Sequence, residues 1–517
     1  MNLPPVRSKT LYLIAFAAIL IFFASSLTTD IDRPWVNQID FNGAVWSQAA
    51  HNILRAGLFE TQGASTAFYF GPLPIPNRGY YLHHPPLLHL AVAAMFAVFG
   101  EHEWAARAVP IACMMASVVL LWLLVNSTLG PRTATFTAAA FVGLPMTLRY
   151  GPMVNFEPMV LTLILLALLS LRYWQATGRS LWKYLFFGAL LTGMWVDWAM
   201  HLFAIVIFAW WMTRPGRPQR RLAWAVLLVT ALSGALYLIH TQILRPDALK
   251  DLQNTFLVRV ASDEKYKFTF GQWLFRVSRS ALNHYLWIGI IPAVIGAAVA
   301  WKRRHEEGFR WMGWAAFTVA AMDAIFVGVF QNDSYIHEYI AFYFIMPVAV
   351  MIGIALNEAS LATERLGKWR ALGYACVWIF AIVAIGAGEA QTTSMAGRFC
   401  ILDPSSNKAE PETLIPQLGA AIRKHFSPKT RVLCNFMPYY GPHLLYYAER
   451  EMAPNLADPR DWKPYIQENK GTEMGGIVWM GDDDAPAIIA NLPPGKKEFV
   501  RLENESFCVW TPGNRRF

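Results

Sequence analysis

Charged residues are scarce in this chain. Asp, Glu, Lys and Arg together make up 15% of its 517 residues, whereas an ordinary soluble domain carries about 25%. Hydrophobic residues account for 55% and aromatic residues for 14%. This composition excludes a disordered chain and a small disulfide-stapled domain, and it argues against a soluble enzyme. It predicts an all-α polytopic membrane protein instead.

The motifs of common soluble enzymes are also missing. The sequence contains no P-loop, no strand–GxGxxG–helix unit, no CxxC pair and no HExxH. It shows no internal repeat and no low-complexity tract. The net charge of +9 comes from basic residues in short runs between apolar stretches, not from one groove-sized patch. We therefore expect neither a nucleotide cofactor nor a nucleic-acid partner.

Cysteine is rare, with five residues in the chain. Cys113 and Cys376 lie in apolar runs and are expected to pack as small hydrophobic residues. Cys400, Cys434 and Cys508 fall in the polar C-terminal part. If that part faces an oxidising compartment, two of the three can form a disulfide and one thiol is left over.

Long apolar runs dominate the first three quarters of the chain. A spanning helix needs about 20 residues, and the run 85–99 has only 15, begins with His83-His84-Pro85-Pro86 and ends at Gly100. We interpret it as an interfacial or re-entrant helix that does not cross. The remaining runs predict 11 transmembrane helices, at 11–29, 104–126, 133–149, 153–171, 181–195, 199–212, 222–241, 284–301, 311–330, 337–357 and 371–388.

The positive-inside rule fixes the expected orientation. With 85–99 not crossing, the loops on the side of the N-terminus carry 17 Lys and Arg against four acidic residues. We therefore place the N-terminus in the cytoplasm and three long segments outside, at 30–103, 242–283 and 389–517. The last is charged and Pro-rich, with strands expected at Arg431–Cys434 and Gly476–Trp479 and helices at 412–425, 442–450 and 484–491. This pattern predicts a membrane domain over 1–388 and a small α/β extracytoplasmic domain over 389–517.

Polar residues gather on the predicted outer face. Each cluster also has a structural explanation: Asp40 can cap a helix, Arg107 can snorkel at a membrane boundary, and Glu157 suits the first turn of a helix. Because all six clusters fall on the same predicted face, we nevertheless expect a functional site there. The six clusters are Asp30, Asp32 and Asp40; Tyr80–Pro86, with His83 and His84; Glu101–Glu103 with Arg107; Asn155–Pro158, with Glu157; Asp197 with His201; and Gln331–Tyr339.

Four short segments in the first third of the chain resemble a known family. They are Leu54–Gly57, Tyr81–Leu87, Phe99–Arg107 and Gly130–Arg132, and the resemblance returns at His337–Tyr339 and Pro347. Together they are similar to the C-type integral-membrane glycosyltransferases, which include the protein O-mannosyltransferases and the bacterial lipid A aminoarabinose transferases.

The resemblance implies a sugar donor carried on a polyprenyl phosphate. It implies that Asp40 is the catalytic carboxylate, which accepts the proton of an acceptor hydroxyl, and that Glu157 is a second outer acid. It offers Arg78, His84 and Arg107 as contacts to the donor phosphate. His83 with His337 is the candidate pair for a divalent metal ion, and the further candidates are Glu103, Asp197 and Tyr339.

The chain departs from the family pattern at three places. The aminoarabinose transferases have an acid and a Lys before the Pro-Pro pair, where this chain has His83 and His84. Phe41 replaces a frequent Glu, and Glu157 stands where Asp is more usual. These departures affect the expected metal site and phosphate contact most directly.

These observations predict an inverting glycosyltransferase of the bacterial inner membrane. Its acceptor, on the extracytoplasmic face, is a lipid, a glycan or a protein. One alternative is a catalytically inactive binding or assembly subunit. Another is a secondary transporter, but the sequence shows no inverted repeat and its polar clusters lie at one face instead of the membrane midplane.

Overall fold

The computed structural model describes residues 6–35, 40–71, 73–213, 216–261, 267–396, 413–428, 431–434, 437–452, 474–480, 495–502 and 505–512. Contacts divide the chain into two units. The first contains Met1–Thr29, His83–Pro85 and Pro110–Met395, and the second contains Asp30–Leu82, Pro86–Val109 and Ala396–Phe517. This division differs from the predicted boundary at 388/389, because the outer loop groups with the C-terminal segment.

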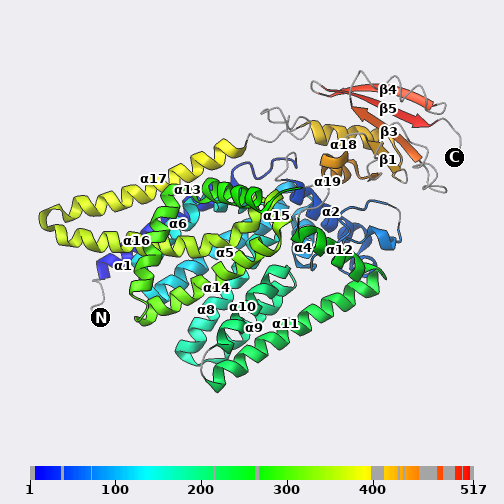
Figure 1. The fold of residues 1–517 in the computed structure, drawn as a ribbon. Helices are drawn as coiled ribbons and strands as arrows, with labels where there is room; N and C mark the ends of the chain where they lie inside the picture. The colour runs from blue at the N-terminus through cyan, green and yellow to red at the C-terminus, as the bar shows by residue number, and fades with distance from the viewer. Residues whose placement is uncertain are drawn as a thin grey trace. The chain divides into compact units, whose positions relative to one another are not determined.

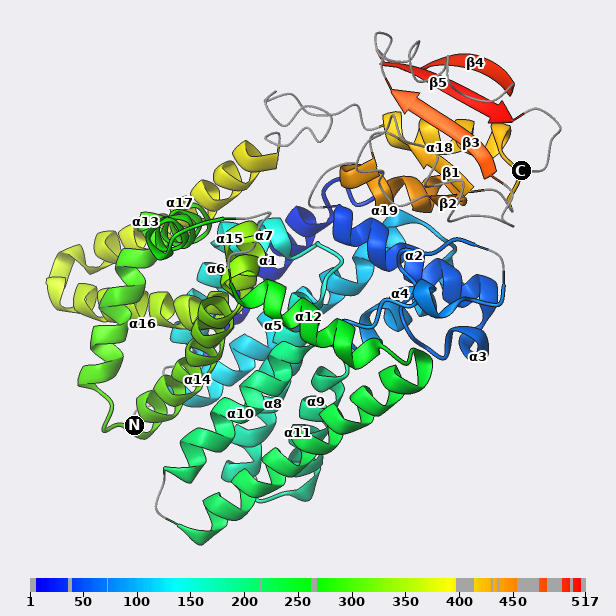
Figure 2. The same ribbon diagram turned by 45° about the vertical axis from the view of Figure 1, so that its right-hand side comes forward.

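Every described secondary-structure element of the first unit is a helix (Figures 1 and 2). Helix α6 packs against α16, α13 against α16, α8 against α9, and α10 against α11. Its elements are α1 (Val6–Thr28), α5 (Glu103–Leu129, whose first turns belong to the second unit), α6 (Pro131–Gly143), α7 (Pro145–Tyr150), α8 (Phe156–Thr177), α9 (Ser180–Met194), α10 (Trp198–Met212), α11 (Arg217–Leu244), α12 (Ala248–Val260), α13 (Phe270–Lys302), α14 (Glu307–Val329), α15 (Gln331–Ile336), η2 (Glu338–Phe344), α16 (Ile345–Thr363), η3 (Glu364–Trp369) and α17 (Arg370–Ala396).

Seven helical stretches among the described residues are long and apolar enough to cross a membrane. The last of them, Glu338–Thr393, contains both α16 and α17. The predicted polytopic, mainly helical fold is thereby confirmed. Helices α9 and α10 have 15 residues each and α6 has 13. These helices are too short to be counted as spans by length, so this criterion gives fewer spans than the 11 that the sequence predicts.

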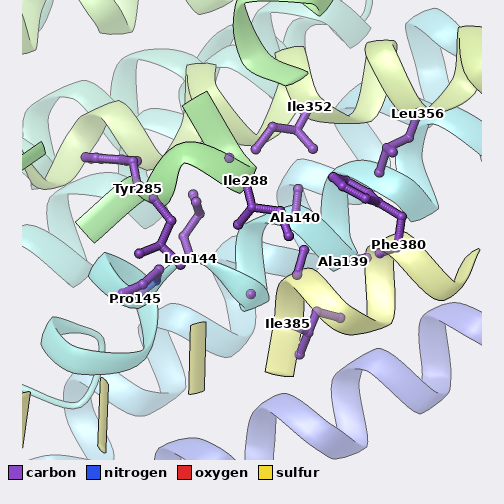
Figure 3. Close-up of a pocket in the computed structure, with 15 residues that line it drawn as sticks. Ala139, Ala140, Leu144, Pro145, Tyr285, Ile288, Ile352, Leu356, Phe380 and Ile385 are labelled. Atoms are coloured by element: carbon purple, nitrogen blue, oxygen red, sulfur yellow. The ribbon is translucent and has the colours of Figure 1, made fainter. Parts of the chain in front are cut away.

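Glycine allows the helices of the first unit to approach closely. A Cβ added at Gly353 would lie 2.1 Å from Oγ1 of Thr137, and one added at Gly296 would lie 1.8 Å from the carbonyl oxygen of Met351. Small residues permit such backbone contact between membrane helices. The space left between α6, α13, α16 and α17 (Figure 3) is a cavity of about 30 Å³, far below the hundreds of Å³ of a ligand site. It is a packing void.

The second unit combines short helices with a mixed sheet. The strand order is β2-β1-β3-β5-β4, with β1 parallel to β2 and β3, and β5 antiparallel to β3 and β4. Its elements are α2 (Phe41–Ala56), α3 (Leu58–Thr61), η1 (Asn77–Gly79), α4 (Leu87–Phe99), α18 (Leu414–His425), β1 (Arg431–Cys434), α19 (Met437–Ala448), β2 (Glu451–Met452), β3 (Met474–Met480), β4 (Gly495–Leu502) and β5 (Glu505–Pro512).

The C-terminal part of this unit is the predicted α/β fold. Leu418 and Ile422 of α18 pack with Val432 of β1 and with Phe507 and Val509 of β5 in one buried core. The strand predicted at 431–434 is confirmed, and the one predicted at 476–479 lies inside β3. The helix predicted at 484–491 lies outside the described residues.

The structure also bears on the predictions for the apolar run 85–99 and for the C-terminal cysteines. Helix α4 has 13 residues, which span about 20 Å, so it is too short to cross a hydrocarbon core of about 30 Å. Cys508 is buried in β5. Cys400 and the side chain of Cys434 lie outside the described part of the chain, and the predicted disulfide stays a prediction.

Candidate functional site

Asp40 stands immediately before α2, in the second unit. Its side chain makes no capping hydrogen bond to the helix, so the capping explanation does not account for it. Instead, Arg33 Nη2 lies 3.2 Å from Oδ2 and Arg107 Nη2 lies 3.1 Å from Oδ1. The carboxylate is only 5% exposed. A carboxylate offers about four lone-pair positions, and two of them face these arginine side chains.

Arg107 is built into the same cluster. It is buried, and its Nη1 donates to the carbonyl oxygen of Ile31 at 2.8 Å and also to that of Arg33. The guanidinium lies over the ring of Trp35, 4.1 Å from its centroid, at a distance that allows cation–π attraction. The snorkelling explanation is therefore wrong for Arg107. Its described contacts hold Asp40 and the chain segment before it.

The first unit contains a cavity of about 370 Å³. One part of its wall carries histidine, carboxylate and guanidinium groups, and another part is apolar. A site of this kind suits a ligand with a charged head and an apolar chain. The lining residues are His83, His84, Asp197, Trp198, Leu238, Leu252, Gln253, Thr255, Phe256, Arg259, Phe326, Phe330 and Asp333.

His84 and Asp197 form a hydrogen-bonded pair in the cavity wall. His84 Nδ1 lies 2.8 Å from Asp197 Oδ1, and its Nε2 lies 3.5 Å from Nη2 of Arg259. Burial lowers the pKa of His84 from its ordinary value, against the opposing effect of Asp197. A neutral imidazole that donates Nδ1–H to a carboxylate keeps its Nε2 lone pair directed toward the guanidinium.

His83 contacts helix α12, which lies in a segment predicted only as an outer loop. Its Nε2 lies 2.9 Å from Oδ2 of Asp251 and 3.2 Å from Oγ1 of Thr255. Asp251, Thr255 and Arg259 are spaced by four residues, which places them on one face of a helix. That spacing was a readable signal, and it was missed.

Two buried acids lie elsewhere in the first unit. Glu157, in the first turn of α8, is 6% exposed, and its Oε2 has no hydrogen-bond partner among the described residues. Asp323, in the middle of α14, is fully buried, and its Oδ2 accepts from the backbone N–H of Phe344 at 2.7 Å. An acid inside an apolar span is a functional candidate by default, and Asp323 was not among the residues predicted from the sequence.

The remaining candidates fall in several places. His337 stacks on Tyr339 with ring centroids 5.1 Å apart, and it lines a second, mostly apolar cavity of about 420 Å³. Glu103 lies in the second unit, in the first turn of α5. The side chain of Arg78 lies outside the described part.

The metal pair expected at His83 and His337 stays a prediction. Within the described ranges, no group of three or more His, Cys, Asp or Glu side chains is arranged to hold a metal ion. His83 contacts Asp251 and Thr255, whereas His337 stacks on Tyr339. No chemical step proposed for this chain depends on a metal ion.

Part of this chain is similar in sequence to a known protein family. Residues 83–240 match the family model described as dolichyl-phosphate-mannose-protein mannosyltransferase. A comparison with curated protein sequences found no significant match. The matched segment includes both histidines of the cavity wall and Asp197.

Solved structures share the fold of nearly the whole chain. ArnT from Cupriavidus metallidurans bound to undecaprenyl phosphate superposes with a TM-score of 0.65 at 12% identity, covering 98% of this chain and 99% of that one. Its apo state gives 0.64 at 13% identity, covering 97% and 98%. The oligosaccharyltransferase of Archaeoglobus fulgidus gives 0.59 at 13% identity, covering 91% and 70%. The predicted resemblance to C-type membrane glycosyltransferases is confirmed, and this chain has their fold.

Proposed function

We propose that this protein is a membrane glycosyltransferase that takes a sugar from a polyprenyl-phosphate donor. The cavity lined by His84, Arg259 and apolar side chains carries the proposal. Its guanidinium group suits a phosphate, and its apolar wall suits the first isoprene units. Undecaprenyl phosphate is bound by the ArnT structure that shares this fold, which supports the same class of donor here.

The proposed reaction is a single displacement. Asp40 accepts the proton of an acceptor hydroxyl while that oxygen attacks the anomeric carbon. The bond from this carbon to the phosphate oxygen breaks, and the lipid phosphate leaves with the electron pair. Arg259, oriented by His84, stabilises the charge of the leaving phosphate. A single displacement inverts the configuration at the anomeric carbon.

Localisation follows from the same proposal. The chain is a multi-pass membrane protein, and the positive-inside count places its N-terminus in the cytoplasm and its C-terminal domain outside. We assign it to the bacterial inner membrane. The acceptor is a lipid, a glycan or a protein reached from the outer face.

The decisive experiment compares wild type with Asp40→Asn. Labelled sugar is loaded on the membrane lipid, and its transfer to any acceptor is measured at equal expression. We expect a loss of about 10²- to 10⁴-fold, the usual contribution of a general base. Asp32→Asn is the matched control, because Asp32 is an exposed acid of the same segment.

Each result of this comparison has a separate meaning. Equal transfer by wild type and Asp40→Asn would remove Asp40 from the mechanism and leave Glu157 and Asp197 as candidates. No transfer by any variant would favour the inactive binding subunit. Metal dependence is measured in the same assay, by chelation followed by add-back of Mn²⁺ or Zn²⁺.

A further inference from the structure

Trp35 lies at the centre of the Asp40 cluster. Its side chain is 1% exposed. The guanidinium of Arg107 lies over its ring, and a Cβ added at Gly43 of α2 would fall 2.3 Å from that ring. Arg107 in turn donates to Asp40. The position of Trp35 therefore decides where Arg107 lies, and Arg107 holds one oxygen of Asp40.

A residue of the C-terminal domain fixes the backbone of Trp35. The Trp35 N–H donates to the hydroxyl oxygen of Tyr447 at 2.8 Å, and that hydroxyl donates to Oε1 of Glu103. Tyr447 lies on α19, which packs against α2. Burial and the charge of Glu103 raise the pKa of Tyr447, so the phenol keeps its proton and makes both hydrogen bonds at once.

A neighbouring contact ties the same helices together. His443, one turn before Tyr447 on α19, is fully buried, and its ring meets Phe41 edge-on with centroids 6.1 Å apart. Phe41 is the residue after Asp40. Helix α19 thus reaches the segment around Asp40 at two points, through Trp35 and through Phe41.

We propose that Tyr447 is a positioning residue for Asp40. It holds the backbone of Trp35, and Trp35 supports the guanidinium that binds the carboxylate. The C-terminal domain is therefore part of the Asp40 site and does more than cover it. The effect on activity rests on the function proposed above, whereas the effect on the position of Trp35 does not.

The test is Tyr447→Phe in the full-length protein. This change keeps the ring and removes both hydrogen bonds. Tyr446→Phe is the matched control, because Tyr446 is the adjacent residue, its ring lies 5.2 Å from that of Tyr447, and no hydrogen bond of its hydroxyl joins it to another described residue. A second variant, Glu103→Gln, removes the charge of the acceptor that orients the Tyr447 hydroxyl, and so weakens the support that this hydroxyl gives to the Trp35 N–H.

Two readouts are taken from each variant. Hydrogen exchange followed by mass spectrometry measures protection of the peptides that contain Trp35 and Asp40. Sugar transfer measures kcat and KM for the lipid donor. For Tyr447→Phe we expect faster exchange in these peptides and a fall in kcat of about 10- to 100-fold, the cost of a small misplacement, with an unchanged KM for the donor. Tyr446→Phe should match wild type in both.

The outcomes separate this inference from the proposed function. Unchanged exchange in Tyr447→Phe overturns the inference, and so does faster exchange with an unchanged kcat. If wild type transfers no sugar, the proposed function fails, and the exchange result alone decides whether Tyr447 holds the Asp40 segment. If Tyr447→Phe does not fold, faster exchange at Trp35 in Glu103→Gln supports the inference and wild-type exchange there overturns it.

Discussion

His84 Nδ1 and Asp197 Oδ1 lie 2.8 Å apart, and this pair joins the turn before Pro85 to the start of α10. Oδ2 of the same carboxylate accepts from the backbone N–H of Ala199 at 3.2 Å. Asp197 therefore caps a helix and orients an imidazole with one side chain.

Asp197→Asn is expected to destabilise the protein in a pH-dependent way. Burial alone would raise the pKa of Asp197, but the hydrogen bond from His84 and those from backbone N–H groups outweigh it, so the pKa is lowered. Because the folded-state pKa is depressed, the stabilisation is present above the unfolded value of about 4 and is lost as the pH falls through the folded value. At pH 7 the variant should lose about 1 kcal/mol, the difference between a hydrogen bond to a charged and to a neutral acceptor.

Thermal unfolding in detergent from pH 7 down to pH 3 checks this prediction. The gap in melting temperature between wild type and Asp197→Asn should narrow toward the acid end. A gap that stays constant over the whole range would contradict a role for the ionised carboxylate.

Arg259→Gln is expected to weaken binding of the lipid donor. Arg259 is the guanidinium of the cavity wall, next to His84 and Asp333. A hydrogen bond to a charged group contributes about 1.5–3 kcal/mol, and 1.4 kcal/mol is a factor of ten in affinity. Undecaprenyl phosphate should therefore bind the variant about 10- to 100-fold more weakly.

Binding is measured by native mass spectrometry of the purified protein with added undecaprenyl phosphate. Arg172→Gln is the control, because Arg172 pairs with Glu307 and does not line the cavity. Equal affinity of Arg259→Gln and wild type would show that the phosphate lies elsewhere.

Local patterns made much of the fold predictable. Apolar runs gave most of the long helices, and a short β-prone run gave the strand at Arg431–Cys434. Asp40 and Arg107 were both candidates, but their contact joins residues 67 positions apart, and no local periodicity reports such a pairing. The family resemblance implied that Arg107 contacts the donor phosphate, whereas in the structure its guanidinium donates to Asp40.

The missed residues fall into two kinds. Arg259 and Asp251 were discoverable, since their spacing marks one helix face, but the segment was interpreted by its mixed charge and not by its period. Trp35 and Tyr447 were not discoverable in this way. Their roles depend on the packing of α19 against α2, which is tertiary information that a single sequence does not contain.

Asp323 offers a prediction about stability. Its Oδ2 accepts the backbone N–H of Phe344 just before α16 begins. Asp323→Ala would leave this N–H without its partner in a buried environment and should cost about 1–3 kcal/mol. Asp323→Asn keeps an acceptor oxygen and should cost less. Thermal unfolding of both variants ranks them, and equal melting temperatures would mean that the N–H finds another partner.

Gly43→Ala is expected to destabilise the protein, against the ordinary preference of helices. In a helix interior Ala is favoured over Gly by about 1 kcal/mol. At Gly43, however, the new Cβ would lie 2.3 Å from the ring of Trp35, so the ring must move away from Arg107. Overpacking of this kind costs about 1–3 kcal/mol, which exceeds the gain in helix propensity.

Gly188→Ala in α9 is the matched control, because its Cβ would meet no atom within 4 Å. Thermal unfolding should show a lower melting temperature for Gly43→Ala and an equal or higher one for Gly188→Ala. Sugar transfer should fall in Gly43→Ala alone, since only that variant displaces the ring beneath the arginine that holds Asp40. If Gly43→Ala were as stable and as active as wild type, Trp35 would have room to shift without disturbing Asp40, and the cluster would not depend on the position of this ring.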